Sequence, residues 1–242
     1  MLLVVAALEE ELKAGMRLCR GLESASGGRL RRGTRDGRAV GFLRAGVGPE
    51  KAARNLAAAL EKVRPERILV VGYAGALDPD LKLGSLVAAT RAIELSLDGA
   101  DPDWSRVRAG GTFDLADAQA LLSAAAGIGA TAGTVLTSPH VLGNPAHKEI
   151  LFRSFHASIV DMETAALARV AACAGVRLGC VRAVSDEARD TFLQPFAFDP
   201  SSGVGDRVKT LLRTGMGRTW RQWREHAAVA GTSLERFLDR YL

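Results

Sequence analysis

The segment from Ala39 to Gly72, AVGFLRAGVGPEKAARNLAAALEKVRPERILVVG, predicts a strand, a helix and a second strand in that order. Its two ends, residues 39–44 and 68–72, are short apolar runs typical of buried strands. Between them, residues 50–62 carry apolar side chains at helical spacing, and Pro65 stops the helix. A strand, a helix and a strand in sequence imply parallel strands joined by a right-handed crossover, so this segment indicates an α/β fold.

The same alternation continues along the rest of the chain. Further strands are predicted at residues 2–8, 85–90, 133–136, 159–162 and 178–184. Further helices are predicted from Glu9 onward and at residues 115–126, 146–155 and 163–173, with loops at 96–112 and 190–203. Because no linker interrupts this order, residues 1–203 are predicted to form one domain with a mixed, mostly parallel central sheet flanked by helices. Residues 204–242 are predicted to be a basic helical extension packed on that domain, with a break near Gly231.

The composition is that of an ordinary globular protein, with 48% hydrophobic and 24% charged residues among 242. Cys19, Cys173 and Cys180 form no C-x-x-C pair and are predicted to be reduced and buried. The N-terminal residues lack the pattern of a secretory signal, and no apolar run reaches the roughly 18 residues of a membrane-spanning helix. These features predict a cytoplasmic protein.

The chain is basic, with a formal net charge of +5 and a pI of about 9.4. The arginines fall into two groups, one in a predicted hairpin at residues 29–38 and one at residues 207–224. The two groups do not combine into one basic patch with interleaved aromatic residues, which is typical of nucleic-acid binding. The arginines are therefore predicted to lie on solvent-exposed surfaces. We therefore expect no nucleic-acid partner.

Two other classes of chemistry lack their motifs. The four histidines, His140, His147, His156 and His226, show no zinc spacing. Neither G-x-S-x-G nor the phosphate-binding G-x-x-x-x-G-K-[ST] occurs, which disfavours a serine nucleophile and ATP chemistry. We expect no metal and no cofactor.

Acidic residues follow several predicted strands, at the edge where α/β sheets bind ligands. Glu11 follows the first strand and has two possible roles. It could stabilise the first turn of a helix through its negative charge, or it could be a base that activates water. The local sequence alone favours the first role. Asp161 and Glu163 lie at a strand–helix junction, where burial is expected. Capping of the helix accounts for the presence of one of these acids but not of both. Asp186, after Ser185, fits a helix cap and a proton donor equally well.

Two glycine turns also follow strands. Gly46-Val47-Gly48 precedes a predicted helix, where backbone N–H groups can bind phosphate or ribose oxygens, although a simple tight turn explains it better. Gly72-Tyr73-Ala74-Gly75 follows the next strand, and its small residues allow a ligand to approach the backbone.

Taken together, these segments resemble the purine nucleoside phosphorylase and nucleosidase superfamily over about residues 2–196. Ala7-Leu8-Glu9-Glu10-Glu11 looks like the start of the 5′-methylthioadenosine/S-adenosylhomocysteine nucleosidases. The other matching motifs, in chain order, are Gly46-Val47-Gly48, Gly72 to Leu77 with Leu83 to Val87, Asp161 to Ala166, and Val181 to Asp186. The resemblance implies a phosphorylase/hydrolase-like α/β fold, a small-molecule purine nucleoside as substrate, release of adenine and a homo-oligomeric assembly.

The resemblance also implies roles in breaking the N-glycosidic bond. Asp186 would protonate the purine at N7 or stabilise that proton, with Ser185 orienting it. Glu163 would hold the ribose hydroxyls, Met162 would pack under the sugar, and Glu11 would polarise the attacking water. Other residues would line the substrate site: Gly46, Tyr73, Gly75, Val141, Leu142 and Phe196.

Some positions depart from the family pattern. Tyr73 stands where the nucleosidases usually have serine, and Val141 stands where an aromatic usually stacks on the purine. Leu142 would then offer backbone contacts, and Phe196 is the candidate aromatic that covers the substrate. These departures keep a catalytically inactive nucleoside-binding protein open as an alternative.

The nucleophile and the substrate's 5′ group also stay open. Water is favoured because Glu11 would repel a phosphate, but Arg44 is a candidate ligand for phosphate as co-substrate. Leu77-Asp78-Pro79-Asp80-Leu81 and the arginine-rich C-terminal segment resemble a hopanoid-associated branch that removes adenine from an adenosylated lipid. That branch would place the C-terminal helix at a membrane surface, whereas packing on the domain or on a second subunit is favoured. The candidate apolar stripe consists of Leu211, Met216, Trp220, Trp223, Ala227 and Ala228.

Overall fold

The computed structural model describes residues 1–26, 28–97, 103–191 and 217–242. Its strands are Leu2–Ala6 (β1), Arg20–Ser26 (β2), Leu30–Arg35 (β3), Arg38–Arg44 (β4), Arg67–Ala76 (β5), Leu86–Ser96 (β6), Arg108–Asp114 (β7), Ala130–Thr137 (β8), Ile159–Asp161 (β9) and Arg177–Asp186 (β10). Its helices are Glu9–Arg17 (α1), Pro49–Leu60 (α2), Ala118–Ala124 (α3), Pro145–Phe155 (α4), Thr164–Cys173 (α5) and Gly217–Tyr241 (α7), with a 3₁₀ turn at Trp104–Arg106 (η1).

The strands join in one mixed sheet, which confirms the predicted α/β class. At its centre, β4, β1, β5 and β10 pair in parallel, in that order. The antiparallel pairs are β2–β3, β3–β4, β5–β9, β6–β7 and β6–β10. The remaining strand, β8, pairs in parallel with both β6 and β9. Because β10 pairs with both β5 and β6, strands β5, β10, β6, β8 and β9 close into a ring.

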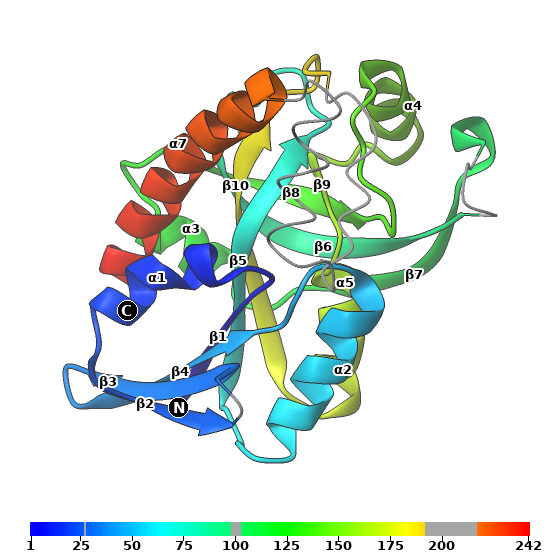
Figure 1. Ribbon diagram of the computed structural model, residues 1–242. Helices are drawn as coiled ribbons and strands as arrows, with labels where there is room; N and C mark the ends of the chain where they lie inside the picture. Colours follow the sequence, from blue (N-terminus) through cyan, green and yellow to red (C-terminus); the bar gives the residue numbers. More distant parts are fainter. Residues whose placement is uncertain (27, 98–102, 192–216) are drawn as a thin grey trace.

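Helices cover both faces of this sheet (Figure 1). On one face, α2 and α5 pack through buried Leu56 and Leu167. On the other, α1, α3 and α7 bury Leu12, Leu121 and Phe237. A third apolar cluster joins α4 and η1 to the end of the sheet, at the edge where β5, β8 and β9 finish. The ends of β5, β8 and β9 therefore lie beside α4 and η1.

One predicted loop contains regular structure. The sequence predicts an irregular loop at residues 96–112, but β7 begins at Arg108 and pairs antiparallel with β6, and η1 precedes it. The prediction was wrong because β7 is an exposed edge strand that contains Gly110 and Gly111 and lacks the apolar run of a buried strand. Similarly, α3 begins only at Ala118, after Asp117 in a left-handed conformation, rather than at Leu115.

The predicted break near Gly231 is also wrong, because α7 runs unbroken from Gly217 to Tyr241. Gly231 instead allows a close approach: a Cβ there would lie 3.1 Å from the Tyr73 hydroxyl. Buried side chains farther along the helix, including Leu234 and Leu238, pack α7 on the same body as α1 and β10. The proposed boundary at 203/204 lies outside the described residues and stays a prediction.

Candidate active site

Two glycines of β5 make room for charged side chains of its neighbour β10. Gly72 pairs with Arg182 and Gly75 with Asp186 in the parallel register. A Cβ at Gly72 would meet the Arg182 guanidinium and would lie 2.7 Å from Glu11 Oε1. A Cβ at Gly75 would lie 2.7 Å from Asp186 Oδ2. The small residues therefore admit three charged groups to the strand ends, as close approach requires.

Glu11 is buried at the start of α1, and backbone groups fix both of its carboxylate oxygens. The Leu8 N–H donates to Oε2 at 2.7 Å, and the Tyr73 N–H donates to Oε1 at 2.9 Å. The first bond caps α1 and the second ties the helix to β5. Burial raises the pKa of Glu11, while Arg182 and the two N–H groups oppose that rise. Glu11 is therefore both the helix-start acid that its pattern suggests and a buried base candidate.

Arg182 is buried at the centre of the charged cluster, and it is not among the residues with a role predicted from sequence. Its Nη2 donates to Asp161 Oδ2 and, at 2.9 Å, to Thr164 Oγ1, and lies 3.6 Å from Glu163 Oε2. Burial alone would lower the pKa of Arg182, but the acids around it, led by Asp161, raise it. The arginine therefore stays charged between the carboxylates.

Asp161 and Glu163, the two acids of the strand–helix junction, bind different parts of the protein. Asp161 accepts hydrogen bonds from Thr137 Oγ1 at 2.7 Å and from the Thr164 N–H at 3.1 Å, so it anchors β9, β8 and the start of α5. Glu163 accepts from the Gly48 N–H at 2.9 Å, which joins the first glycine turn to α5. Burial, opposed by Arg182, raises the pKa of Glu163 to about 8.

The raised pKa of Glu163 predicts a pH-dependent stability. Because the folded protein keeps this proton between its ordinary pKa of 4.5 and about 8, while the unfolded chain loses it, the free energy of unfolding falls as pH rises through that range. The expected slope is at most about 1.4 kcal/mol per pH unit. Urea unfolding of the wild type and of Glu163→Gln at about pH 5 and about pH 7.5 measures it. Equal slopes for both proteins would contradict the assignment.

Asp186 ends β10 between a hydroxyl and a buried ammonium. Ser185 Oγ lies 2.8 Å from Asp186 Oδ1, the arrangement expected for an orienting serine. Lys148 Nζ, from α4, lies 2.5 Å from Asp186 Oδ2 and donates to the Glu187 carbonyl at 2.8 Å. Nothing in the pattern around Lys148 distinguishes it from a solvated helix lysine, so only the fold reveals this pair.

The other predicted substrate residues lie in different surroundings. Met162 is half-buried between the two junction acids, and Leu142 is buried whereas its neighbour Val141 is 48% exposed. Burial raises the pKa of Tyr73 to about 12, helped by Glu11, and its hydroxyl approaches α7. Phe196 lies outside the described residues.

Two candidate groups near the first glycine turn are engaged by the protein. The Gly46 N–H donates to the Ala7 carbonyl at 3.1 Å, which ties the ends of β1 and β4. Arg44 is exposed, and its Nη1 lies 3.6 Å from the Glu9 carboxylate. The roles of these residues in binding remain predictions.

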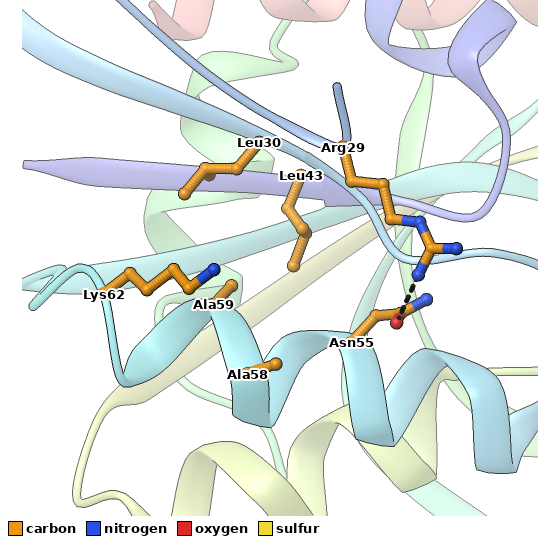
Figure 2. Close-up of a pocket in the computed structure, with 7 residues that line it drawn as sticks. All are labelled: Arg29, Leu30, Leu43, Asn55, Ala58, Ala59 and Lys62. Atoms are coloured by element: carbon orange, nitrogen blue, oxygen red, sulfur yellow. Dashed lines mark hydrogen bonds between the residues drawn. The ribbon is translucent and has the colours of Figure 1, made fainter. Parts of the chain in front are cut away.

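A shallow pocket lies away from these strand ends, between the β3–β4 hairpin and α2 (Figure 2). Leu30, Leu43 and Ala59 form its apolar part, and Arg29 donates to Asn55 Oδ1 at 2.8 Å on one side. None of the predicted site residues lines this pocket.

The described part of the chain contains no group of three or more His, Cys, Asp or Glu side chains arranged to hold a metal ion. Among the same residues, no helix is both long and apolar enough to cross a membrane. Of the three cysteines predicted to be buried, Cys180 is buried and Cys19 half-buried, but the prediction is wrong for Cys173, which is exposed at the end of α5.

The fold is α/β, and its candidate site combines buried carboxylates with buried cations. The family model of the phosphorylase superfamily matches residues 2–219. The chain therefore belongs to the phosphorylase superfamily and is an enzyme of the N-glycosidase type.

Curated relatives are similar over most of their length. The 5′-methylthioadenosine/S-adenosylhomocysteine nucleosidase of Geobacillus kaustophilus is 29% identical over 198 residues, 76% of this chain and 83% of that protein. The nucleosidase of the same name from Marinomonas is 28% identical over 170 residues, 66% of this chain and 74% of that protein.

Solved structures share the fold at lower identity. The 5′-methylthioadenosine/S-adenosylhomocysteine nucleosidase of Neisseria meningitidis, in complex with methylthio-immucillin-A, has a TM-score of 0.75 at 19% identity and covers 100% of this chain and 99% of its own. The futalosine hydrolase of Helicobacter pylori has a TM-score of 0.74 at 18% identity and covers 99% and 95%. At these identities the likeness supports the fold alone.

Proposed function

We propose that the protein hydrolyses the N-glycosidic bond of an adenosyl-type purine nucleoside and releases adenine. The observation that carries this proposal is the placement of Glu11 and Asp186 against one strand, at glycines three residues apart. Three residues of a strand span about 10 Å. That separation suits an attacking water at one end of a nucleoside and its purine at the other.

The buried groups of the cluster suit the charges that develop in this reaction. Water attacks C1′ and gives a proton to Glu11, the C1′–N9 bond breaks, and its electron pair passes to the purine. Burial keeps the pKa of Glu11 above its ordinary value, which makes it a better base than a solvated glutamate. The purine leaves as neutral adenine because N7 takes up one proton from solvent, which Asp186 stabilises there, and Glu11 afterwards returns the proton of the attacking water to solvent. Glu163 accepts hydrogen bonds from the ribose hydroxyls.

Arg182 adds a donor beside the attacking water. Within the described residues its buried Nε has no hydrogen-bond partner, and an unsatisfied buried donor costs about 1–3 kcal/mol. A water or hydroxyl bound between Arg182 and Glu11 would satisfy it. This arrangement supports water over phosphate, because the carboxylate of Glu11 beside Arg182 would repel an anionic nucleophile.

The choice of nucleophile gives a direct prediction. We expect the purified protein to release adenine from methylthioadenosine or adenosylhomocysteine at the same rate with and without phosphate. Chromatography of the products should show the free sugar and no sugar 1-phosphate. A rate that depends on phosphate would instead support phosphorolysis with Arg44 as ligand. Adding futalosine and an adenosylated lipid to the assay, with detection of whichever base is released, tests the 5′ group. Size-exclusion chromatography tests the expected homo-oligomer.

Tight nucleoside binding without turnover would favour the alternative of an inactive nucleoside-binding protein. The curated relatives named above are nucleosidases, and the buried Glu11 and Asp186 retain the groups that hydrolysis needs. These observations favour an active enzyme. Calorimetric binding measured beside the adenine-release assay separates the two outcomes.

A further inference from the structure

Lys148 is a fully buried cation that the roles above leave unused. It lies in the first turn of α4, which begins where the Asn144 side chain accepts from the Ala146 N–H and Pro145 follows. Its side chain is 0% exposed, and its Nζ contacts Asp186 Oδ2 and the Glu187 carbonyl. The lysine thus joins α4 to the end of β10.

The position of this lysine works against folding stability in two ways. Burying an ammonium and a carboxylate removes both from water, and their mutual attraction often only offsets that loss. A cation in the first turn of a helix also faces the positive end of the helix dipole. The presence of Lys148 at this site is therefore better explained by its effect on Asp186 than by a contribution to folding stability.

The helix that presents Lys148 is itself held in place. His147, its neighbour, stacks on Trp104 of η1 with ring centroids 5.2 Å apart, and Leu151 is buried in the same apolar cluster. The segment before α4 carries Val141 and Leu142, the residues expected to contact the purine. Lys148 therefore couples the predicted base-binding segment to the carboxylate predicted to act on that base.

We propose that Lys148 is a positioning residue that holds the Asp186 carboxylate toward the purine. Its ammonium donates to Asp186 Oδ2, and the Ser185 hydroxyl donates to Asp186 Oδ1. Because both oxygens are bound, the carboxylate cannot rotate away from the leaving group. This inference rests on the proposed function and adds that the orientation of Asp186 is set from α4 as well as from β10.

A double-mutant cycle on the purified full chain tests the proposal. Lys148→Met should lower kcat for adenine release by about 10²-fold, the cost of a misplaced catalytic group, and leave KM much less affected. Lys148→Arg, which keeps the charge, should recover part of that loss. In an Asp186→Asn background, Lys148→Met should cost no more than about a further twofold, because a residue that acts through Asp186 has nothing left to position.

The matched control is Lys82→Met, since Lys82 is 67% exposed and contacts the Glu187 side chain at 3.5 Å. It should keep the wild-type kcat. An unchanged kcat in Lys148→Met, or the same loss with and without Asp186, would overturn the inference while the wild type stays active. Wild-type protein that releases no adenine would overturn the proposed function itself. If Lys148→Met does not fold, Lys148→Gln, which keeps a donor without the charge, enters the same cycle.

Discussion

Replacing Asp186 by asparagine is expected to lower the rate of adenine release by about 10²–10⁴-fold, the usual contribution of a general acid or base. The asparagine keeps the shape of the side chain and can still face Ser185 and Lys148, but it carries no negative charge to stabilise a proton on the purine. The loss should appear mainly in kcat, because the ribose contacts of Glu163 are untouched. Initial rates of adenine release over a range of substrate concentrations measure it.

The control for this substitution is Asp114→Asn, which makes the same change at a surface ion pair whose acid is 86% exposed. It should leave the rate unchanged. Because Asp186→Asn breaks a buried ion pair, its thermal unfolding must be compared with that of the wild type. A folded Asp186→Asn protein with a rate within about tenfold of the wild type would contradict the role assigned to this carboxylate.

Replacing Glu11 by glutamine should cost a similar factor of about 10²–10⁴, because the amide cannot take a proton from water. The substitution also disturbs the backbone contacts, since one of the two N–H groups from Leu8 and Tyr73 would face an NH₂ group instead of an oxygen. Such an unsatisfied donor costs about 1–3 kcal/mol of stability. The fall in the rate of adenine release should be much larger than the fall in the fraction of folded protein that this loss of stability causes.

Glu10→Gln is the matched control, because Glu10 lies one residue earlier in α1 and is exposed. It should retain the wild-type rate. If Glu11→Gln stays folded and releases adenine as fast as the wild type, Glu11 is a structural cap of α1 and the nucleophile needs another base. Recovery of activity by added phosphate would point to phosphorolysis instead.

Much of the fold can be predicted from local pattern. Apolar runs such as residues 68–72 and 178–184 mark central strands because both faces of those strands are buried. The failures have equally local causes. β7 is an exposed edge strand containing glycine, so its sequence resembles a loop, and Gly231 suggested a break although it serves close packing against Tyr73.

The candidate site divides in the same way. Asp161, Glu163 and Asp186 stand out in sequence because acids at the junctions of apolar segments are expected to be buried for a reason. Arg182 carries a comparable signal, because it is a charged residue inside an apolar strand. Lys148 offered none, because a lysine in a helix is ordinarily solvated.

The sequence by itself therefore determined the α/β class and the acids at the strand ends, since both follow from patterns a few residues long. Only the tertiary structure decided which cations meet those acids. Glu11 and Arg182 are 171 positions apart in the chain, and both lie against Gly72. Lys148 reaches Asp186 from another layer of the fold. Such partners depend on strand register and helix placement, which packing of the whole chain sets and no short segment encodes.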